Sequence, residues 1–394
     1  MATERTDPVE PELSIIVPVR NGAGTLRACL EALVSAPGPA RELIVVDDGS
    51  EDNSADIAAS LGVRTLKYAH RLGCAGARNS GARHTTGPVL VFVDDDVVIH
   101  PSALQRISKF MSENPDYCAV FGSYDSEPGD PGFMSQYRNL LHHFTHQRGK
   151  CEAETFWTGL GAIRRSDFQK IGEFRSIPAV ADVALGLELS DAGFRIRLDR
   201  DLLGTHLKSW TFTSILATDI FLRAAPWSEI ILKRGRITDD LNTTLLNRIG
   251  VALAMATVGL AGLAAIIPGF CPLAAVSLLG ALLANTHLFK RYWKARGIVF
   301  TLGVVPLLFV HQLCCGAGLA LALKRYVINA TWPLHDGRVS VQPPNREAAG
   351  ARPYHGSALA SRWPATSEFE QFPVDGGTSQ RGCTQSPLLL SPLE

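Results

Sequence analysis

The sequence predicts an α/β fold in which a mostly parallel sheet carries helices on both faces, followed by interfacial helices and a small C-terminal transmembrane helical bundle. Residues 13–210 alternate short apolar runs with amphipathic stretches, which is typical of a parallel sheet covered on both sides. Charged residues make up only 19% of the 394 residues, against about 25% in soluble domains. Two long segments after residue 248 contain no charged residue, which indicates a membrane portion.

Strands and helices are expected to alternate through the first part of this region. Each expected strand is a short run of mostly apolar, β-branched residues, and each expected helix is a longer stretch with apolar residues on one side. In such sheets, ligands bind beyond the carboxyl ends of the strands. The expected strands are Leu13–Val19, Leu43–Val46, Val63–Tyr68 and Val89–Val93, and the expected helices are Thr25–Val34, a helix from Asn53, and Ala75–His84.

Residues 211–248 mix apolar residues with arginine and lysine around Pro226 and Trp227. Such a segment forms either an ordinary surface helix packed on the core or amphipathic helices at a membrane surface, with Trp227 at the level of the lipid headgroups. Because the uncharged segments follow directly, we expect amphipathic interfacial helices.

The region 249–323 is expected to cross the membrane. Residues 249–267 and 271–289 are each just long enough for a hydrocarbon core of about 30 Å. Residues 298–323 contain Gly and Pro and form either a third span or a broken re-entrant helix; we expect a span. The basic loop 290–297 predicts, by the positive-inside rule, a multi-pass protein of the cell inner membrane with a cytoplasmic N-terminal domain.

The chain ends and the overall charge give further expectations. Residues 1–11 are polar, with no apolar segment typical of a signal peptide, and residues 330–394 are rich in Pro, Gly and Ser. We therefore expect both ends to be disordered. The net charge of zero argues against a nucleic-acid partner, and the scattered cysteines indicate reduced thiols rather than disulfides.

Acidic residues follow two of the expected strands. Asp94, Asp95 and Asp96 come directly after Val89–Val93, and Asp47 with Asp48 ends the second strand. Carboxylates this close repel one another, so the triplet indicates either a bound divalent cation or a cluster at the start of the helix that follows. Two acidic strand ends in one sheet favour a site for a cation and a diphosphate.

Four spaced motifs resemble the family 2 glycosyltransferases of the GT-A fold. They are SIIVPVRNG, IVVDDGSEDNS, CAGARNSGARHTTG and LVFVDDDV, and the resemblance covers residues 12–210. It implies that a nucleotide sugar is bound by Pro18, Val19, Asn21, Asp47, Asp48, Arg78, Asn79, Asp94 and Asp95. It also implies that Asp94 and Asp96, with His206 as a possible further ligand, hold Mn²⁺ or Mg²⁺.

The resemblance further implies that Asp182 is the catalytic base of an inverting reaction. Relatives carry Glu-Asp before an apolar helix, whereas this chain has Ala181 and Asp182. An aspartate at this place could instead cap the helix. As a base, it would deprotonate the acceptor hydroxyl during attack on the anomeric carbon.

Two further segments resemble the acceptor side of relatives. Trp157, Thr158 and Gly159 form the first, and Lys208 and Trp210 belong to the second, HLKSW. Trp157 either stacks on a sugar or fills the core, and His206 is either a ligand or structural. The absence of a QxxRW motif after Asp182 indicates transfer of a single sugar.

The expected function is therefore that of a metal-dependent, hexosyltransferase-type glycosyltransferase. It would move one sugar from a nucleotide-diphosphate sugar to a membrane-associated acceptor, either a lipid or a polyprenyl phosphate. The alternatives are a tethered glycosyltransferase with a soluble or cell-envelope polymer acceptor, and a catalytically weakened GT-A binding or scaffold protein.

Overall fold

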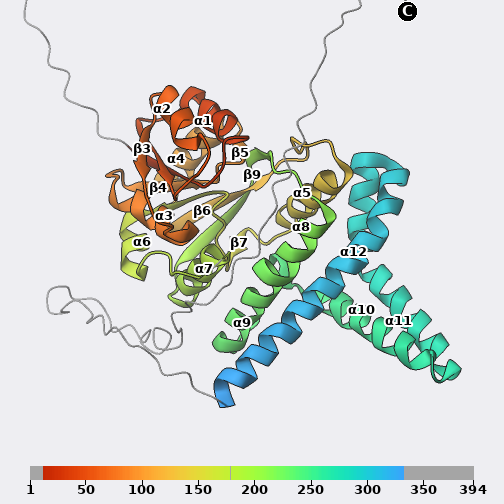
Figure 1. Cartoon of the computed structure of the whole chain (residues 1–394). Coiled ribbons are helices and arrows are strands. Elements are labelled where there is room, and N and C mark those ends of the chain that lie inside the picture. Colours follow the sequence, from red (N-terminus) through yellow and green to blue (C-terminus); the bar gives the residue numbers. More distant parts are fainter. Residues whose placement is uncertain (1–11, 178, 332–394) are drawn as a thin grey trace, which may run out of the picture. The chain divides into compact units, whose positions relative to one another are not determined.

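A computed structural model describes residues 12–177 and 179–331 (Figure 1). Its N-terminal part is a mixed sheet covered by helices. The strands are β1 (Leu13–Val19), β2 (Arg41–Asp47), β3 (Arg64–Lys67), β4 (Val89–Val93), β5 (Val97–Ile99), β6 (Tyr117–Tyr124), β7 (Glu152–Ala153), β8 (Leu160–Arg164) and β9 (Arg195–His206). The helices are α1 (Leu26–Ser35), α2 (Ser54–Ser60), α3 (Gly73–Arg83), α4 (Ala103–Glu113), α5 (Phe133–His146), α6 (Arg165–Ile171) and α7 (Ala181–Asp191).

The strands lie in the order β3–β2–β1–β4–β8–β6–β9–β5, with β7 paired to β9. The first four strands are parallel, as the sequence predicts, and so are β6 and β9. Strand β8 runs antiparallel to β4 and β6, so the sheet is mixed rather than mostly parallel. Because Val93 pairs with Leu160, the residues just before β8 lie beside the carboxyl end of β4.

Alternate residues of the central strands supply two separate cores. On β1, Ile15 and Val17 belong to the core that includes α1 and α4, whereas Ile16 belongs to the core that includes α3, α6 and α7. This alternation follows from the two-residue repeat of a strand. Helices therefore cover both faces, which confirms the predicted fold class, and the seven predicted elements all form with ends shifted by no more than two residues.

A helical region follows β9. Three helices continue one another: α8 (Phe212–Ala217), the π-helical segment η1 (Thr218–Ala224) and α9 (Ala225–Arg234). The region predicted as amphipathic, 211–248, is thus helical from residue 212 to 234 and again from 245, with the short η2 (Leu241–Thr243) in between. The remaining helices are α10 (Leu245–Ala264), η3 (Pro268–Phe270), α11 (Cys271–Ala284) and α12 (Thr286–Thr331).

Among the residues that the structure describes, two helices are long and apolar enough to cross a membrane, Leu245–Ala264 and Thr286–Ile328. Most of the predicted segment 249–267 lies in the first, and all of 298–323 lies in the second. Helix α11 ends earlier than the predicted segment 271–289, because the chain leaves the helix at Asn285.

Helix α12 is interrupted at one position. Gly297 has φ 80° and ψ 178°, a conformation that only glycine adopts readily, and it divides the basic part of α12 from the apolar part. The predicted segment 298–323 then continues through Pro306 as one helix, rather than as a broken re-entrant one. Apart from the last turn of α12, the ends predicted to be disordered, 1–11 and 330–394, lie outside the described residues.

Helix α5 joins the sheet domain to the helical region. Arg138 of α5 forms a buried ion pair with Asp219 of η1 at 2.5 Å, and Asp219 also contacts His311 of α12 at 2.7 Å. The Tyr292 hydroxyl of α12 donates to the carbonyl of Tyr137 at 2.7 Å. The two regions are thus connected by buried polar contacts as well as by apolar packing.

We predict that Gly186→Ala destabilises the protein by about 1–3 kcal/mol. A Cβ at this position of α7 would lie 2.1 Å from the Phe156 nitrogen and 2.4 Å from the Thr155 carbonyl carbon, and backbone atoms cannot move aside cheaply. Thermal unfolding of the full chain in detergent measures the effect. Ser190→Ala on the same helix is the control and should change stability by less than about 0.5 kcal/mol. Equal melting of the two variants would contradict the close packing of α7.

Candidate active site

The carboxyl ends of β1, β2 and β4 lie side by side, because Val19 pairs with Asp47 and Ile16 pairs with Phe92. A cavity of about 520 Å³ opens at this edge. It is lined by Arg20, Asn21, Gly22, Gly24, Thr25, Asp95, Asp96, Leu207, Lys208 and Ser209. Three segments far apart in sequence therefore meet in one cavity, and four of its residues, Asn21, Asp95, Asp96 and Lys208, are predicted site residues.

Neighbouring groups oppose the repulsion among the three adjacent carboxylates. The buried Arg78 guanidinium donates to Asp94 Oδ1 at 2.6 Å. Asp95 packs against Gly22, where a Cβ would lie 2.0 Å from Asp95 Oδ2, so only glycine fits there. Burial, reinforced by the charges of Asp96 and Asp94, raises the pKa of Asp95 to about 8. Asp94 is therefore paired with a guanidinium, whereas Asp95 is favoured as a neutral acid.

Asp96 and His206 form the part of the site that best fits a metal ion. His206 Nε2 lies 3.3 Å from Asp96 Oδ2, and its Nδ1 donates to Asn139 Oδ1 at 2.7 Å. Trp210 Nε1 donates to the same oxygen at 3.0 Å, which fixes the orientation of the Asn139 amide. Because Nδ1 is occupied by the hydrogen bond to Asn139, Nε2 is the nitrogen that faces the Asp96 carboxylate, which is the usual arrangement of a metal-binding histidine.

Two protein ligands do not complete a metal site. In the part of the chain that the structure describes, no group of three or more His, Cys, Asp or Glu side chains is placed to hold a metal ion. Hard cations such as Mg²⁺ commonly take one or two carboxylates and fill the remaining positions with phosphate oxygens and water. The donor set of Asp96 and His206 therefore fits an ion that binds together with a diphosphate.

The predicted donor residues around β1 and β2 divide into two groups. Asp47 is fully buried, and its Oδ2 has no hydrogen-bond partner among residues 12–177 and 179–331, so it is free to accept from a ligand. Asp48 instead accepts from the backbone nitrogens of Leu72 and Gly73, at the start of α3. Pro18 and Val19 are buried in the strand. The structure thus gives Asp48 a contact that holds α3 in place.

Asn79 also has a structural contact. Its side-chain amide donates to the Phe174 carbonyl at 2.8 Å and accepts from the Phe174 nitrogen at 3.0 Å. This pair of bonds fastens α3 to the loop before α7. Arg78, the preceding residue, points instead to Asp94, so only one of these two predicted donor residues reaches the acidic cluster.

Asp182 lies in the first turn of α7, close to this cluster. Val180 occupies the N-cap position, so Asp182 does not cap the helix. The Thr158 nitrogen and hydroxyl both lie 3.4 Å from Asp182 Oδ2. Burial raises the pKa of Asp182 above its ordinary value, although the Arg78 guanidinium opposes the shift. Ala181, in place of the expected glutamate, is buried in the apolar core.

Trp157 and Gly159 are placed by the start of β8. The half-buried Trp157 ring packs between Tyr124 at 4.8 Å and His142 at 4.9 Å, between ring centroids. Gly159 leaves room for this ring, because a Cβ there would lie 2.2 Å from Trp157 Cζ2, and its carbonyl accepts from the Asp94 nitrogen. Trp157 therefore belongs to an aromatic cluster that adjoins the acids.

Lys208 and Trp210 have different surroundings. The Lys208 ammonium lies 4.7 Å from the Trp210 ring centroid and lines the cavity of Asp95 and Asp96. The structure thus places Lys208 at the edge predicted for the donor, rather than with Trp157. Sequence reasoning missed Asn139 and Tyr124, which orient and stack on His206. No motif marks either residue, and only the fold brings them to the site.

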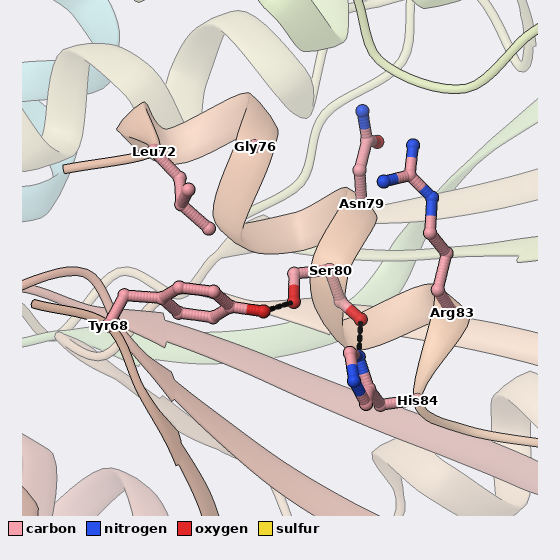
Figure 2. Close-up of a pocket in the computed structure, with 7 residues that line it drawn as sticks. All are labelled: Tyr68, Leu72, Gly76, Asn79, Ser80, Arg83 and His84. Carbon is pink, nitrogen blue, oxygen red and sulfur yellow. Dashed lines mark hydrogen bonds between the residues drawn. The ribbon is translucent and has the colours of Figure 1, made fainter. Parts of the chain in front are cut away.

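A second cavity of about 410 Å³ lies on α3 (Figure 2). Most of its polar groups are paired within the protein: the Tyr68 hydroxyl lies 2.6 Å from Ser80 Oγ, His84 Nδ1 bonds the Ser80 carbonyl, and Arg83 bonds Glu173. Of the predicted site residues, Asn79 lines this second cavity, whereas Asp94, Asp95 and Asp96 do not. The candidate active site is therefore the cavity at the carboxyl ends of the strands.

Comparison with known proteins agrees with this geometry. Residues 14–172 match the family model described as glycosyl transferase family 2. The chain is 23% identical over 315 residues to the glycosyltransferase AglE of Haloferax volcanii, covering 77% of this chain and 92% of that protein. It is 30% identical over 147 residues to the protein MT1568 of Mycobacterium tuberculosis, covering 36% of this chain and 46% of that protein, or less than half its length.

A solved structure shares the fold. The mannosyltransferase PcManGT of Pyrobaculum calidifontis, determined in complex with GDP-Man and Mn²⁺, matches with a TM-score of 0.52 and 20% identity. The match covers 80% of this chain and 88% of that chain. The matched family model, the GT-A sheet and the acids at its carboxyl edge agree with one another, so residues 14–172 are similar in sequence and in fold to glycosyl transferase family 2.

Proposed function

We propose that the protein is an inverting glycosyltransferase that moves a single sugar from a nucleotide-diphosphate sugar to a lipid or polyprenyl-phosphate acceptor at a membrane. The observation that carries this proposal is the meeting of Asp94, Asp96 and His206 with Asp182 at one edge of the sheet. The solved complex of PcManGT with GDP-Man and Mn²⁺ supports a nucleotide sugar and a divalent ion for this chain as well.

The donor would lie in the 520 Å³ cavity. Asp96 and His206 would hold Mn²⁺ or Mg²⁺, and the bound ion would neutralise the negative charge that develops on the leaving diphosphate. Lys208 lines the same cavity and would contact the diphosphate directly. Asp47, with its free buried oxygen, and Asn21 would contact the nucleoside. Arg78 would hold the Asp94 carboxylate in position.

Asp182 would act as the base on the acceptor side. Its Oδ2 accepts from Thr158, and its raised pKa makes it a better proton acceptor than an exposed aspartate. The proton of the acceptor hydroxyl would pass to Asp182 while the acceptor oxygen bonds the anomeric carbon and the nucleoside diphosphate leaves. Attack opposite the leaving group inverts the configuration of that carbon.

The helical region supports an acceptor at a membrane. Large apolar side chains are exposed along the two candidate spans, including Val299 at 82% and Leu302 at 63%. Arg296, in the basic segment before Gly297, donates to Gln136 and contacts Glu127 of the sheet domain. The basic segment thus lies on the same side as the sheet domain, which supports a cytoplasmic domain on a multi-pass protein of the inner membrane.

We predict that membranes containing the protein incorporate radiolabelled sugar from a suitable nucleotide sugar into the lipid extract when Mn²⁺ is present. A panel of labelled nucleotide sugars, followed by lipid extraction and counting of both phases, tests this expectation. Label that enters only water-soluble or polymer products would contradict the lipid acceptor and would support a tethered glycosyltransferase with a soluble or cell-envelope polymer acceptor. Turnover of no donor, with the wild type and the Asp182→Asn variant alike, would support a binding or scaffold protein.

We predict that Asp182→Asn lowers kcat/KM by about 10²–10⁴ without loss of folding. Because the pKa of Asp182 is raised in the folded protein, ionisation of this carboxyl lowers the free energy of unfolding as the pH rises. The asparagine side chain carries no charge, so the variant does not lose this stability. The variant should therefore melt at the same or a higher temperature at pH 7. In the wild type, the acid limb of kcat/KM should lie above the pKa of an ordinary aspartate. A less stable variant, or a limb at the ordinary value, would contradict the assigned base.

We predict that His206→Ala weakens Mn²⁺-dependent binding of GDP or UDP by about 10–100-fold, and that Asn139→Ala weakens it to a smaller extent. Titration calorimetry of the full chain in detergent, with and without Mn²⁺, measures this binding. His84→Ala, at the exposed end of α3, is the matched control and should bind like the wild type. Unchanged Mn²⁺ dependence in His206→Ala would remove His206 from the metal site.

A further inference from the structure

A cation of the helical region lies close to the candidate base. Arg223 is in the π-helical segment η1, and one and two turns later Trp227 and Ile230 belong to an apolar cluster with Val183 of α7 and Val180, the residue before α7. Residues spaced by four and seven positions share one helix face. Arg223 therefore continues the face that contacts α7, the helix that carries Asp182 in its first turn.

Arg223 has no salt bridge or hydrogen bond within residues 12–177 and 179–331. Asp219, one turn earlier, already pairs with Arg138 at 2.5 Å and His311 at 2.7 Å. The guanidinium groups of Arg138 and Arg223 therefore lie near the same acid, Asp219, and Asp219 forms its contacts with Arg138 and His311. Burial, followed by repulsion from Arg138, lowers the pKa of Arg223 to about 10, so it keeps its charge at neutral pH. Its charge also acts on Tyr124 and Asp182.

Further unpaired polar groups surround this cation. His142 Nδ1 and Trp227 Nε1 are buried and have no partner among the described residues. The His142 ring lies 4.4 Å from the Tyr124 ring, which stacks on His206 at 4.0 Å, between centroids. Burial keeps the pKa of His142 well below its ordinary value, so it is neutral and can donate or accept. The region between Arg223 and His206 thus contains a positive charge, that of Arg223, and two buried ring nitrogens that can bond a ligand, those of His142 and Trp227.

Resting on the proposed function, we infer that Arg223 binds the phosphate headgroup of the acceptor beside Asp182. The acceptor class is then a lipid phosphate monoester, rather than a neutral glycolipid. An arginine suits this task because its planar fork of donors matches phosphate oxygens. The positive charge also offsets the repulsion between the phosphate and the Asp182 carboxylate. The π-helical turn is a feature often found at functional sites, and it carries both Asp219 and Arg223.

The chemistry of such a step balances. In the monoanion of a phosphate monoester, one oxygen carries a proton with a pKa of about 6, and Asp182 can accept that proton. One phosphate oxygen then forms the bond to the anomeric carbon, while the bond from that carbon to the nucleotide breaks and the nucleoside diphosphate leaves. No oxidant, reductant or further reactant is needed. Arg138, held by Asp219, would be a positioning residue that keeps η1 on the sheet domain.

The test is binding of farnesyl phosphate to the full chain in detergent, with farnesol and inorganic phosphate as comparisons, measured by titration calorimetry. We expect farnesyl phosphate to bind more tightly than either comparison, and Arg223→Gln to weaken it at least tenfold. Arg223→Lys should recover part of the affinity. Arg236→Gln is the matched control, because Arg236 is an exposed cation of the same segment that is already paired with Glu154.

Three outcomes would overturn the inference. Farnesol binding as tightly as farnesyl phosphate would show that the headgroup is not recognised. Inorganic phosphate binding as tightly would exclude a lipid headgroup as the ligand. Unchanged affinity in Arg223→Gln would remove Arg223 from the site. Parallel titration of GDP and UDP with Mn²⁺ separates this result from the proposed function, because loss of nucleotide binding concerns the donor cavity and not Arg223.

Discussion

Mutual repulsion among Asp94, Asp95 and Asp96 is the constraint around which the site is organised. Three consecutive carboxylates cannot all remain ionised at a buried strand end without counter-charges. Arg78 supplies one to Asp94, His206 faces Asp96, and burial favours the neutral form of Asp95. Each partner comes from a different element, so α3, β9 and β4 must all be in place before the cluster can form.

The antiparallel strand β8 extends this arrangement toward the acceptor side. Its pairing with β4 brings Thr158 and Gly159 next to Asp94, and Thr158 in turn contacts Asp182 at the start of α7. A parallel strand in the same place would have brought its carboxyl end, instead of its amino end, beside the carboxyl end of β4. The reversal in the sheet is thus the feature that places the candidate base near the acids, and it explains why the second half of the sheet differs from the first.

Helix α5 performs a similar task between the sheet domain and the helical region. Asn139 orients His206, while Arg138, the neighbouring residue, pairs with Asp219 of η1. One helix therefore connects His206, the candidate metal ligand, to the segment that carries Arg223. Because the ion pair of Arg138 and Asp219 is buried, removal of either partner would leave an uncompensated charge. The position of the helical region relative to the candidate site depends on this buried contact.

The sequence by itself determined the parallel half of the sheet, the acidic strand ends and the long apolar segments after residue 248. These features follow from local patterns: apolar runs at strand spacing, motifs at turns, and long stretches without charge. It did not determine the antiparallel β8, the structural contacts of Asp48 and Asn79, or the contact of Asn139 with His206. Those depend on groups far apart in sequence, such as His206 and Asn139, which become neighbours only when β9 packs beside α5. Long-range contacts of this kind leave no local pattern, so only the tertiary structure decided which polar residues form the site and which hold the fold.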